Sequence, residues 1–254
     1  MNQSSNINVQ VATDSKLAKT INVQDQILSI TPHGLTFVKP VTLSIPYSGE
    51  IPPVIVSFDS TNNKYSVLPV TSIDKVNKKI NVLTYHFSEF GKYVVDTSTI
   101  ATTPEIYNSN FDISVDRFQI GNNTATDLAG TAVQNSGGAC WGFAAFSKWY
   151  YETKKTSDGF LRGKFGCNEK NVVSDAFSTQ NSITKIAFTL DEILGMIDPD
   201  KMDEYNFNSI AAAIKVTGHP QIIGLGSLLS LDRHAVLATN ITGPSQSLKH
   251  RFDL

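Results

Sequence analysis

Cys140 is the residue of this chain whose surroundings most favour chemistry. It stands between Gly137-Gly138 and Trp141-Gly142-Phe143, at the expected start of an apolar helix. A cysteine reacts as its thiolate, and the partial positive charge at a helix N-terminus favours that form. Gln134, six residues upstream, can donate its side-chain amide to an oxyanion beside the Cys140 N–H. The alternative is a small buried hydrophobe, which is common for free cysteines. The combination predicts a thiol nucleophile.

A thiol nucleophile needs a base, and His234 is the best candidate among the five histidines. It opens an expected apolar strand over 234–238; the alternative is a structural histidine at a strand end. His219 is the rival, but its Gly-His-Pro turn is a poor place for an aimed imidazole. We expect His86 to be a packed histidine at a strand end, and His33 to be exposed in a turn.

Two stretches of the chain resemble papain-like cysteine peptidases. Residues 134–152 are similar to the active-site helix of that family, and residues 234–238 are similar to its His-Ala-Val strand. Residues 111–120 further resemble the lead-in strand of bacterial members in which such a peptidase follows a β-sandwich. The resemblance implies an α+β domain in which the histidine strand faces the cysteine helix across a cleft.

The resemblance also implies roles for individual side chains. Gln134 would be the oxyanion donor, Cys140 the nucleophile, and His234 the general base and later the acid. The family orients its histidine with a later Asn or Asp, and Asp253 stands at a plausible distance, almost at the end of the chain. Asn240 is the fallback, although a straight strand would separate it from His234 by about 20 Å. No metal or other cofactor is required.

The stretch after the histidine is short for this family. Only twenty residues follow His234, so the domain is either compact or cut short. We therefore expect a weak enzyme, with detectable labelling of Cys140, poor turnover and a small effect of Asp253→Ala. Cys167, the other cysteine, has no partner motif and is expected to be structural.

The first 96 residues predict an all-β domain. Segments rich in β-branched residues, several alternating with period two, are separated by turn sequences. Short strands at this spacing suggest a β-sandwich. The expected strands are 36–38, 41–45, 54–58, 65–68 and 79–84.

Part of this region resembles a known module. Residues 32–47 and 86–90 are similar to the β-sandwich shared by ankyrins, netrin receptors and zonula occludens proteins, of which bacterial surface proteins carry relatives. The similarity spans about 25–95, and the module's opening strands are poorly matched, consistent with a truncated start. The module implies a structural or interaction role with a protein partner and no chemistry of its own.

The chain therefore predicts two domains. A β-sandwich over 1–96 is followed by a linker over 97–106, and then by an α+β papain-like domain over 107–254, compact or truncated. The Thr-rich segment 96–104 lacks periodicity and is the expected point of protease attack. The expected helices are 140–153, 183–197 and 209–217, and the expected late strands are 221–225 and 234–238.

Composition excludes several classes of protein. A chain with 41% hydrophobic and 17% charged residues can form packed cores, which argues against wholesale disorder. A net charge of -2 and the lack of a basic stripe make nucleic acid an unexpected partner. No apolar run is long enough to predict a membrane span, and the polar start is not a signal peptide. Localisation stays open, including a secreted or cell-surface place within a longer chain.

The predicted function is thiol-dependent hydrolysis of peptide bonds in a peptide or protein substrate. One alternative is a surface binding or structural protein whose peptidase-like domain is inactive or truncated. The other is a thiol amidase or transglutaminase that acts on cell-wall or side-chain amides. Labelling of Cys140 at neutral pH tests the first alternative, and the reaction product tests the second.

Overall fold

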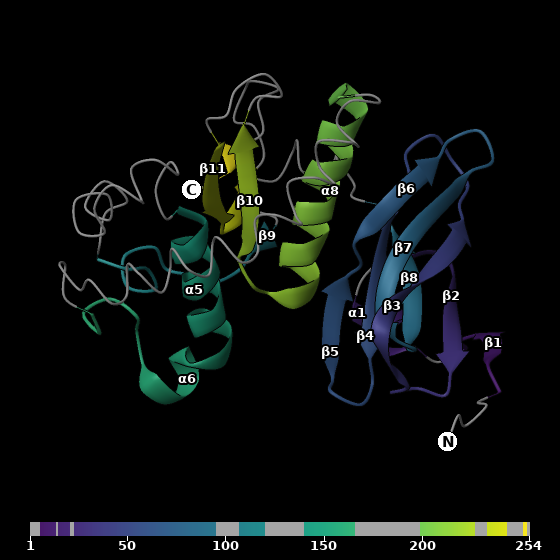
Figure 1. The fold of residues 1–254 in the computed structure, drawn as a ribbon, viewed down its shortest axis with the longest axis horizontal. Helices are drawn as coiled ribbons and strands as arrows, with labels where there is room; N and C mark the ends of the chain where they lie inside the picture. Colours follow the sequence, from purple (N-terminus) through teal and green to yellow (C-terminus); the bar gives the residue numbers. More distant parts are fainter. Residues whose placement is uncertain are drawn as a thin grey trace. The chain divides into compact units, whose positions relative to one another are not determined.

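The computed structural model of this chain describes residues 6–13, 15–20, 23–94, 107–119, 140–165, 199–226, 233–242 and 251–252. The chain divides into two compact units. Unit 1 comprises Met1–Thr99 and Asp198–Thr217, and unit 2 comprises Ile100–Ile197 and Gly218–Leu254. Unit 1 is mostly β-sheet and unit 2 is a small α+β structure (Figure 1), so the predicted division into an all-β part and an α+β part is confirmed in outline.

Unit 1 contains two antiparallel sheets. The five-stranded sheet has the order β1-β2-β8-β4-β5, and the three-stranded sheet has the order β3-β7-β6. The strands of the first sheet are β1 (Asn8–Val11), β2 (Val23–Thr31), β8 (Glu89–Tyr93), β4 (Val54–Asp59) and β5 (Lys64–Val67). Those of the second are β3 (Thr36–Pro46), β7 (Lys79–His86) and β6 (Val70–Asp74).

The β-branched segments predicted as strands are β3, β4, β5 and β7, with the first two predicted segments joined in β3. Four further strands, β1, β2, β6 and β8, were not predicted. The central strand β8 has the sequence Glu-Phe-Gly-Lys-Tyr, which is a weak strand sequence on propensity alone. It forms because it pairs with β2 on one side and β4 on the other, and Phe90 is buried there. Tertiary pairing overrode local preference at this position.

Strand β4 lies at the centre of the packing in unit 1. It is buried at every position from Val54 to Phe58, and neighbouring side chains of a strand point to opposite faces, so both faces are covered. Two helices contact it: α1 (Lys16–Thr20) and α8 (Pro199–Thr217). Helix α8 begins ten residues before the start expected from its sequence. It also lies with β4 and β5 in unit 1, although the sequence assigned it to the later domain.

Unit 2 is built around helix α5 (Cys140–Thr153), which has the predicted bounds and is followed by α6 (Lys155–Asp158). Strands β10 (Gln221–Gly226) and β11 (Arg233–Ala238) form an antiparallel pair that contacts α5. Three short strands form a second sheet with the order β13-β12-β9. They are β9 (Tyr107–Asn108), β12 (Asn240–Thr242) and β13 (Arg251–Phe252). The helix expected over 183–197 and the expected linker 97–106 lie outside the described residues.

The strand expected over 111–120 is wrong for the part that the structure describes, because residues 111–119 form turns. Asp112 Oδ1 accepts hydrogen bonds from both the backbone N–H and the hydroxyl of Ser114. Asp116 Oδ2 accepts the Asp112 N–H at 2.9 Å. Aspartate side chains that bond nearby backbone groups compete with strand pairing and favour turns. The strand that the family resemblance implied here is therefore replaced by turns with local side-chain bonds.

The segment that forms the turns also supplies an anchor for α5. Phe118 is buried with Tyr150 of α5 and with Leu161, and Phe143, Phe146 and Phe165 pack against this group. The Phe118 ring lies 5.2 Å from that of Phe143 and 5.1 Å from that of Phe146. Packing on one side of α5 therefore accounts for Phe143, Phe146 and Tyr150, whereas Trp149 is 46% exposed.

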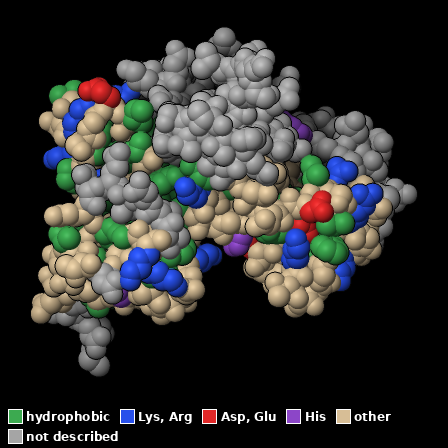
Figure 2. Space-filling view, turned by 180° about the vertical axis from the view of Figure 1, so that it is seen from behind, with side chains coloured by type: hydrophobic (Ala, Val, Ile, Leu, Met, Phe, Trp, Pro, Cys, Tyr) green, Lys and Arg blue, Asp and Glu red, His purple; other side chains and the backbone are tan. Residues whose placement is uncertain are grey.

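The surface carries its charge in small groups. On the face shown in Figure 2, the Lys and Arg side chains of the described residues are separated by other surface and do not form a continuous stripe. In the described part of the chain, no helix is both long and apolar enough to cross a membrane.

Candidate active site

The thiol of Cys140 lies at the start of α5 and contacts the histidine strand. Its Sγ accepts a hydrogen bond from the Ala235 N–H of β11 at 3.3 Å, across 95 residues of sequence. Cys140 is a free, half-buried cysteine, so a reagent can reach it. A thiol at the first turn of a helix faces backbone N–H groups that have no partner within the helix.

The Ala235 contact determines how far His234 is from the thiol. The two residues are bonded neighbours, so ordinary backbone dimensions keep the His234 Cα within about 6 Å of Sγ. An imidazole can span most of that separation by rotation of its side chain. His234 is exposed at the start of β11, opposite Leu225 of β10. The two predicted residues therefore lie in adjacent positions, with the imidazole accessible to solvent.

His219 lies at the other end of α5. Its Nδ1 is 3.1 Å from Glu152 Oε1, and its ring meets the ring of Tyr151 edge to face. Glu152 lies twelve positions after Cys140 on the helix, which corresponds to about 18 Å. Position therefore distinguishes the two candidate bases: His234 lies next to the thiol, and His219 does not. The sequence made this turn a poor place for an aimed imidazole, but in the structure Glu152 contacts the ring.

Glu152 is the most strongly perturbed carboxylate of this region. Partial burial raises its pKa, but the hydrogen bonds and positive charges of His219 and Lys148 outweigh burial and lower the pKa from 4.5 to about 2. Lys148 contacts Glu152 four residues along the helix and also donates to the Pro220 carbonyl at 2.9 Å. Sequence reasoning missed this cluster. The Lys-Glu spacing of four on one helix was the available indication.

The structure changes the geometry assumed for Asn240. The sequence placed it on one straight strand with His234, but the chain leaves β11 at Ala238 and enters β12, which pairs with β9 in a different sheet. The distance estimated along a straight strand therefore does not apply. The Asn240 Oδ1 is buried without a hydrogen-bond partner in the described part of the chain.

Other predicted site residues lie outside the described residues, namely Gln134, Asp253 and Cys167. Residues 251–252, directly before Asp253, are paired with Thr242 and Ile241 of β12. Residues 251–252 are therefore held in a sheet. Among the residues that the structure does describe, no group of three His, Cys, Asp or Glu side chains is arranged to hold a metal ion.

The remaining histidines belong to unit 1. His33 is exposed, as predicted, and lies between the hydroxyls of Ser29 at 3.0 Å and Ser60 at 3.4 Å. His86 ends β7, and its Nδ1 is buried with no hydrogen-bond partner among the described residues.

Comparison with known proteins gives no match for this chain: no protein-family model, no curated protein and no solved structure matches it. Any functional statement therefore depends on the residues themselves and on the geometry of the thiol.

Proposed function

We propose that unit 2 hydrolyses peptide bonds by thiol chemistry, with Cys140 as nucleophile and His234 as general base and acid. The observation that supports this most is the 3.3 Å contact from the Ala235 N–H to the Cys140 Sγ. It brings the backbone of His234 to the thiol across 95 residues of sequence. A nucleophile beside a base is the minimum arrangement for covalent catalysis.

The proposed reaction has two steps. His234 takes the thiol proton, and the Cys140 thiolate attacks the amide carbonyl to give a tetrahedral oxyanion. The C–N bond breaks as His234 returns the proton to the leaving amine, which leaves a thioester on Cys140. Water, deprotonated by His234, hydrolyses the thioester to a carboxylic acid and restores the thiol. The Cys140 N–H at the helix start and the Gln134 side chain are the proposed oxyanion donors.

The family assignment of each unit is also part of this proposal. We infer a papain-like arrangement for unit 2 from the cysteine helix and the His-Ala-Val strand, with Asp253 or Asn240 as the group that orients His234. We infer a β-sandwich interaction module for unit 1, related to that of ankyrins, netrin receptors and zonula occludens proteins. Its two antiparallel sheets support this inference. A protein partner for unit 1 and a peptide or protein substrate for unit 2 complete the proposal.

Labelling of Cys140 tests the proposed function. In a Cys167→Ala background, iodoacetamide should modify Cys140 near neutral pH faster than it modifies the same thiol in the urea-unfolded chain. His234→Ala should slow this reaction about tenfold or more, because each pKa unit of lost thiolate stabilisation costs about a factor of ten. Cys140→Ala should abolish both labelling and peptide hydrolysis.

Other outcomes would favour the alternatives. A folded chain whose Cys140 reacts no faster than the unfolded thiol would favour a binding protein with an inactive peptidase-like unit. Rapid labelling with products that are cross-links or released wall fragments, in place of cleaved peptides, would favour a transglutaminase or thiol amidase.

A further inference from the structure

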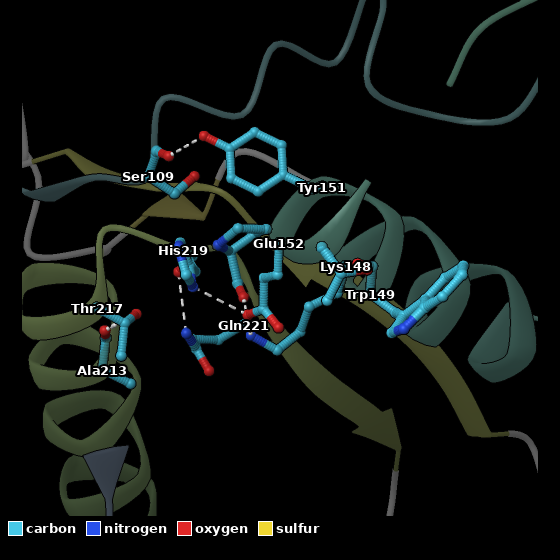
Figure 3. A network of polar contacts seen from close by, with 11 residues as sticks. Ser109, Lys148, Trp149, Tyr151, Glu152, Ala213, Thr217, His219 and Gln221 are labelled. Atoms are coloured by element: carbon cyan, nitrogen blue, oxygen red, sulfur yellow. Dashed lines mark hydrogen bonds and ion pairs between the residues drawn. The ribbon is translucent and has the colours of Figure 1, made fainter. Parts of the chain in front are cut away.

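The cluster of Lys148, Glu152 and His219 lies on α5 and on the chain that enters β10 (Figure 3). Lys148 Nζ contacts Glu152 and donates to the Pro220 carbonyl at 2.9 Å, and His219 Nδ1 lies 3.1 Å from Glu152 Oε1. The Gln221 side chain donates to the His219 carbonyl at 2.9 Å, which closes the turn. Side chains of the helix therefore bind both the backbone and a side chain at the entrance of β10.

The opposite end of the same strand pair meets the opposite end of the same helix. Leu225 of β10 pairs with His234 of β11, and the next residue of β11, Ala235, donates to Cys140. From His219 to Leu225 the extended chain covers about 20 Å. From Glu152 back to Cys140 the helix covers about 18 Å. Because the two lengths match, β10 runs antiparallel to α5, with one anchor at each end.

The two anchors have different strengths. At the thiol end the strand pair contacts the helix through a weak N–H···S bond of 3.3 Å. At the far end two polar contacts join α5 to the chain that enters β10, and the one between Glu152 and His219 involves opposite charges when His219 is protonated. Such contacts are directional as well as attractive, so they determine how far the strand pair can slide along the helix or tilt away from it. A small displacement of reacting groups can lower a rate by a large factor.

We propose that Lys148, Glu152 and His219 form a positioning clamp that aligns the β10–β11 pair on α5 and so keeps His234 beside Cys140. This inference rests on the proposed function for its effect on catalysis. The alignment itself concerns only the Ala235–Cys140 contact. Neither Glu152 nor His219 touches the thiol, so both act through the strand pair. His219, the rival candidate for the general base, thus has a positioning role in this proposal and not a catalytic one.

The test compares clamp variants with a matched ion pair of the same unit. Glu152→Ala, His219→Ala and the double variant remove the clamp in a Cys167→Ala background. Lys155→Met removes the ion pair between Lys155 and Asp116, which measures 2.6 Å and also belongs to this end of the helical segment, but does not involve the strand pair. Glu152→Gln retains a side-chain oxygen that can accept from both partners.

The first measurement is the ratio of Cys140 alkylation rates near pH 6.5 and near pH 9. The high-pH rate corrects for differences in the reagent's access to the thiol, because ordinary cysteine thiols are largely ionised at that pH. Each clamp variant should lower the ratio roughly three- to tenfold, less than His234→Ala does, and the double variant should be no worse than the poorer single one. Glu152→Gln should recover part of the loss, and Lys155→Met should leave the ratio unchanged. An equal loss in Lys155→Met would overturn the clamp.

The second measurement separates the clamp from the proposed function. Hydrogen exchange of the Ala235 amide should accelerate several-fold in Glu152→Ala and in His219→Ala, and should be unchanged in Lys155→Met. Unchanged exchange in the two clamp variants rejects the proposal. If the wild-type thiol proves unreactive, the catalytic proposal fails, and the exchange data still decide whether these residues align the strand pair.

Discussion

A buried charged side chain needs a partner of opposite charge or hydrogen-bond donors, and Asp116 is the clearest example in unit 2. It is 2% exposed, and its Oδ2 accepts both the Asp112 N–H and the Lys155 ammonium. Removing a buried carboxylate leaves both donors without their acceptor. We expect Asp116→Ala to destabilise unit 2 by about 2–4 kcal/mol. Both tryptophans of the chain lie on α5, so urea unfolding followed by their fluorescence reports this unit.

Two variants control this measurement. Asp116→Asn retains an oxygen for the Asp112 N–H and should lose less than Asp116→Ala. Asp158→Ala removes an exposed carboxylate of α6 and should change stability by less than about 0.5 kcal/mol. Equal losses from Asp116→Ala and Asp158→Ala would show that the buried pair adds nothing.

Glu152 gives a pH-dependent prediction at the same scale. The partners His219 and Lys148 lower its folded-state pKa to about 2 from 4.5, despite the opposing effect of burial. The resulting stability is therefore fully present above pH 4.5 and is lost as the pH falls toward about 2. Since the contact is partly open to solvent, we expect about 1 kcal/mol. The stability difference between wild type and Glu152→Gln should shrink over this window, measured by tryptophan fluorescence. A difference that does not change with pH would contradict this.

At the scale of elements, α5 depends on the loop segments that pack against it. Leu161 follows α6 and is 1% exposed within the group formed with Phe118 and Tyr150. We expect Leu161→Ala to destabilise unit 2 by about 2–4 kcal/mol, because it removes buried methyl groups and leaves a cavity. The neighbouring Phe160 is 55% exposed, so Phe160→Ala should cost less than about 1 kcal/mol. If Phe160→Ala were the more damaging change in urea unfolding, the packing described for this helix would be wrong.

At the scale of the whole molecule, helix α8 belongs to a different unit from the segments that precede and follow it in the sequence. It comes after residue 198 in the chain but packs on β4 and β5 of unit 1, with Ala211, Ala212 and Ile214 fully buried. Limited proteolysis should cut first in the Thr-rich segment 96–104, which has few apolar anchors. The fragment that ends there should still co-purify with the later fragment, because unit 1 takes α8 from it.

A direct comparison checks this view of α8. Ile214→Ala should accelerate amide exchange in β4 and leave β10 and β11 unchanged. Release of residues 1–95 as a stable, separate domain after cleavage would favour the original division at residue 96 over the one that includes α8.

The sequence by itself was sufficient wherever the information was local. The bounds of α5 and the pairing segments β4, β7, β10 and β11 follow from apolar periodicity and turn residues, which are properties of neighbouring positions. The prediction that Cys140 is a reactive thiol also rests on local information, namely a helix start and its flanking glycines, and it stays a prediction. Gln134 and Asp253 stay predictions of the same local kind, outside the described residues.

Contacts between distant segments were decided only by the tertiary structure. Strand β8 forms through its neighbours, α8 joins unit 1 through its buried alanines, and the Asp112–Asp116 turn replaced an expected strand through side-chain bonds to the backbone. The same holds for the two histidines. Their sequence contexts ranked them, but only the fold places Ala235 against Cys140 and His219 against Glu152, at opposite ends of one helix. A spacing along the chain carries no such information, because the direction in which a strand pair docks on a helix depends on packing and charge over its whole length.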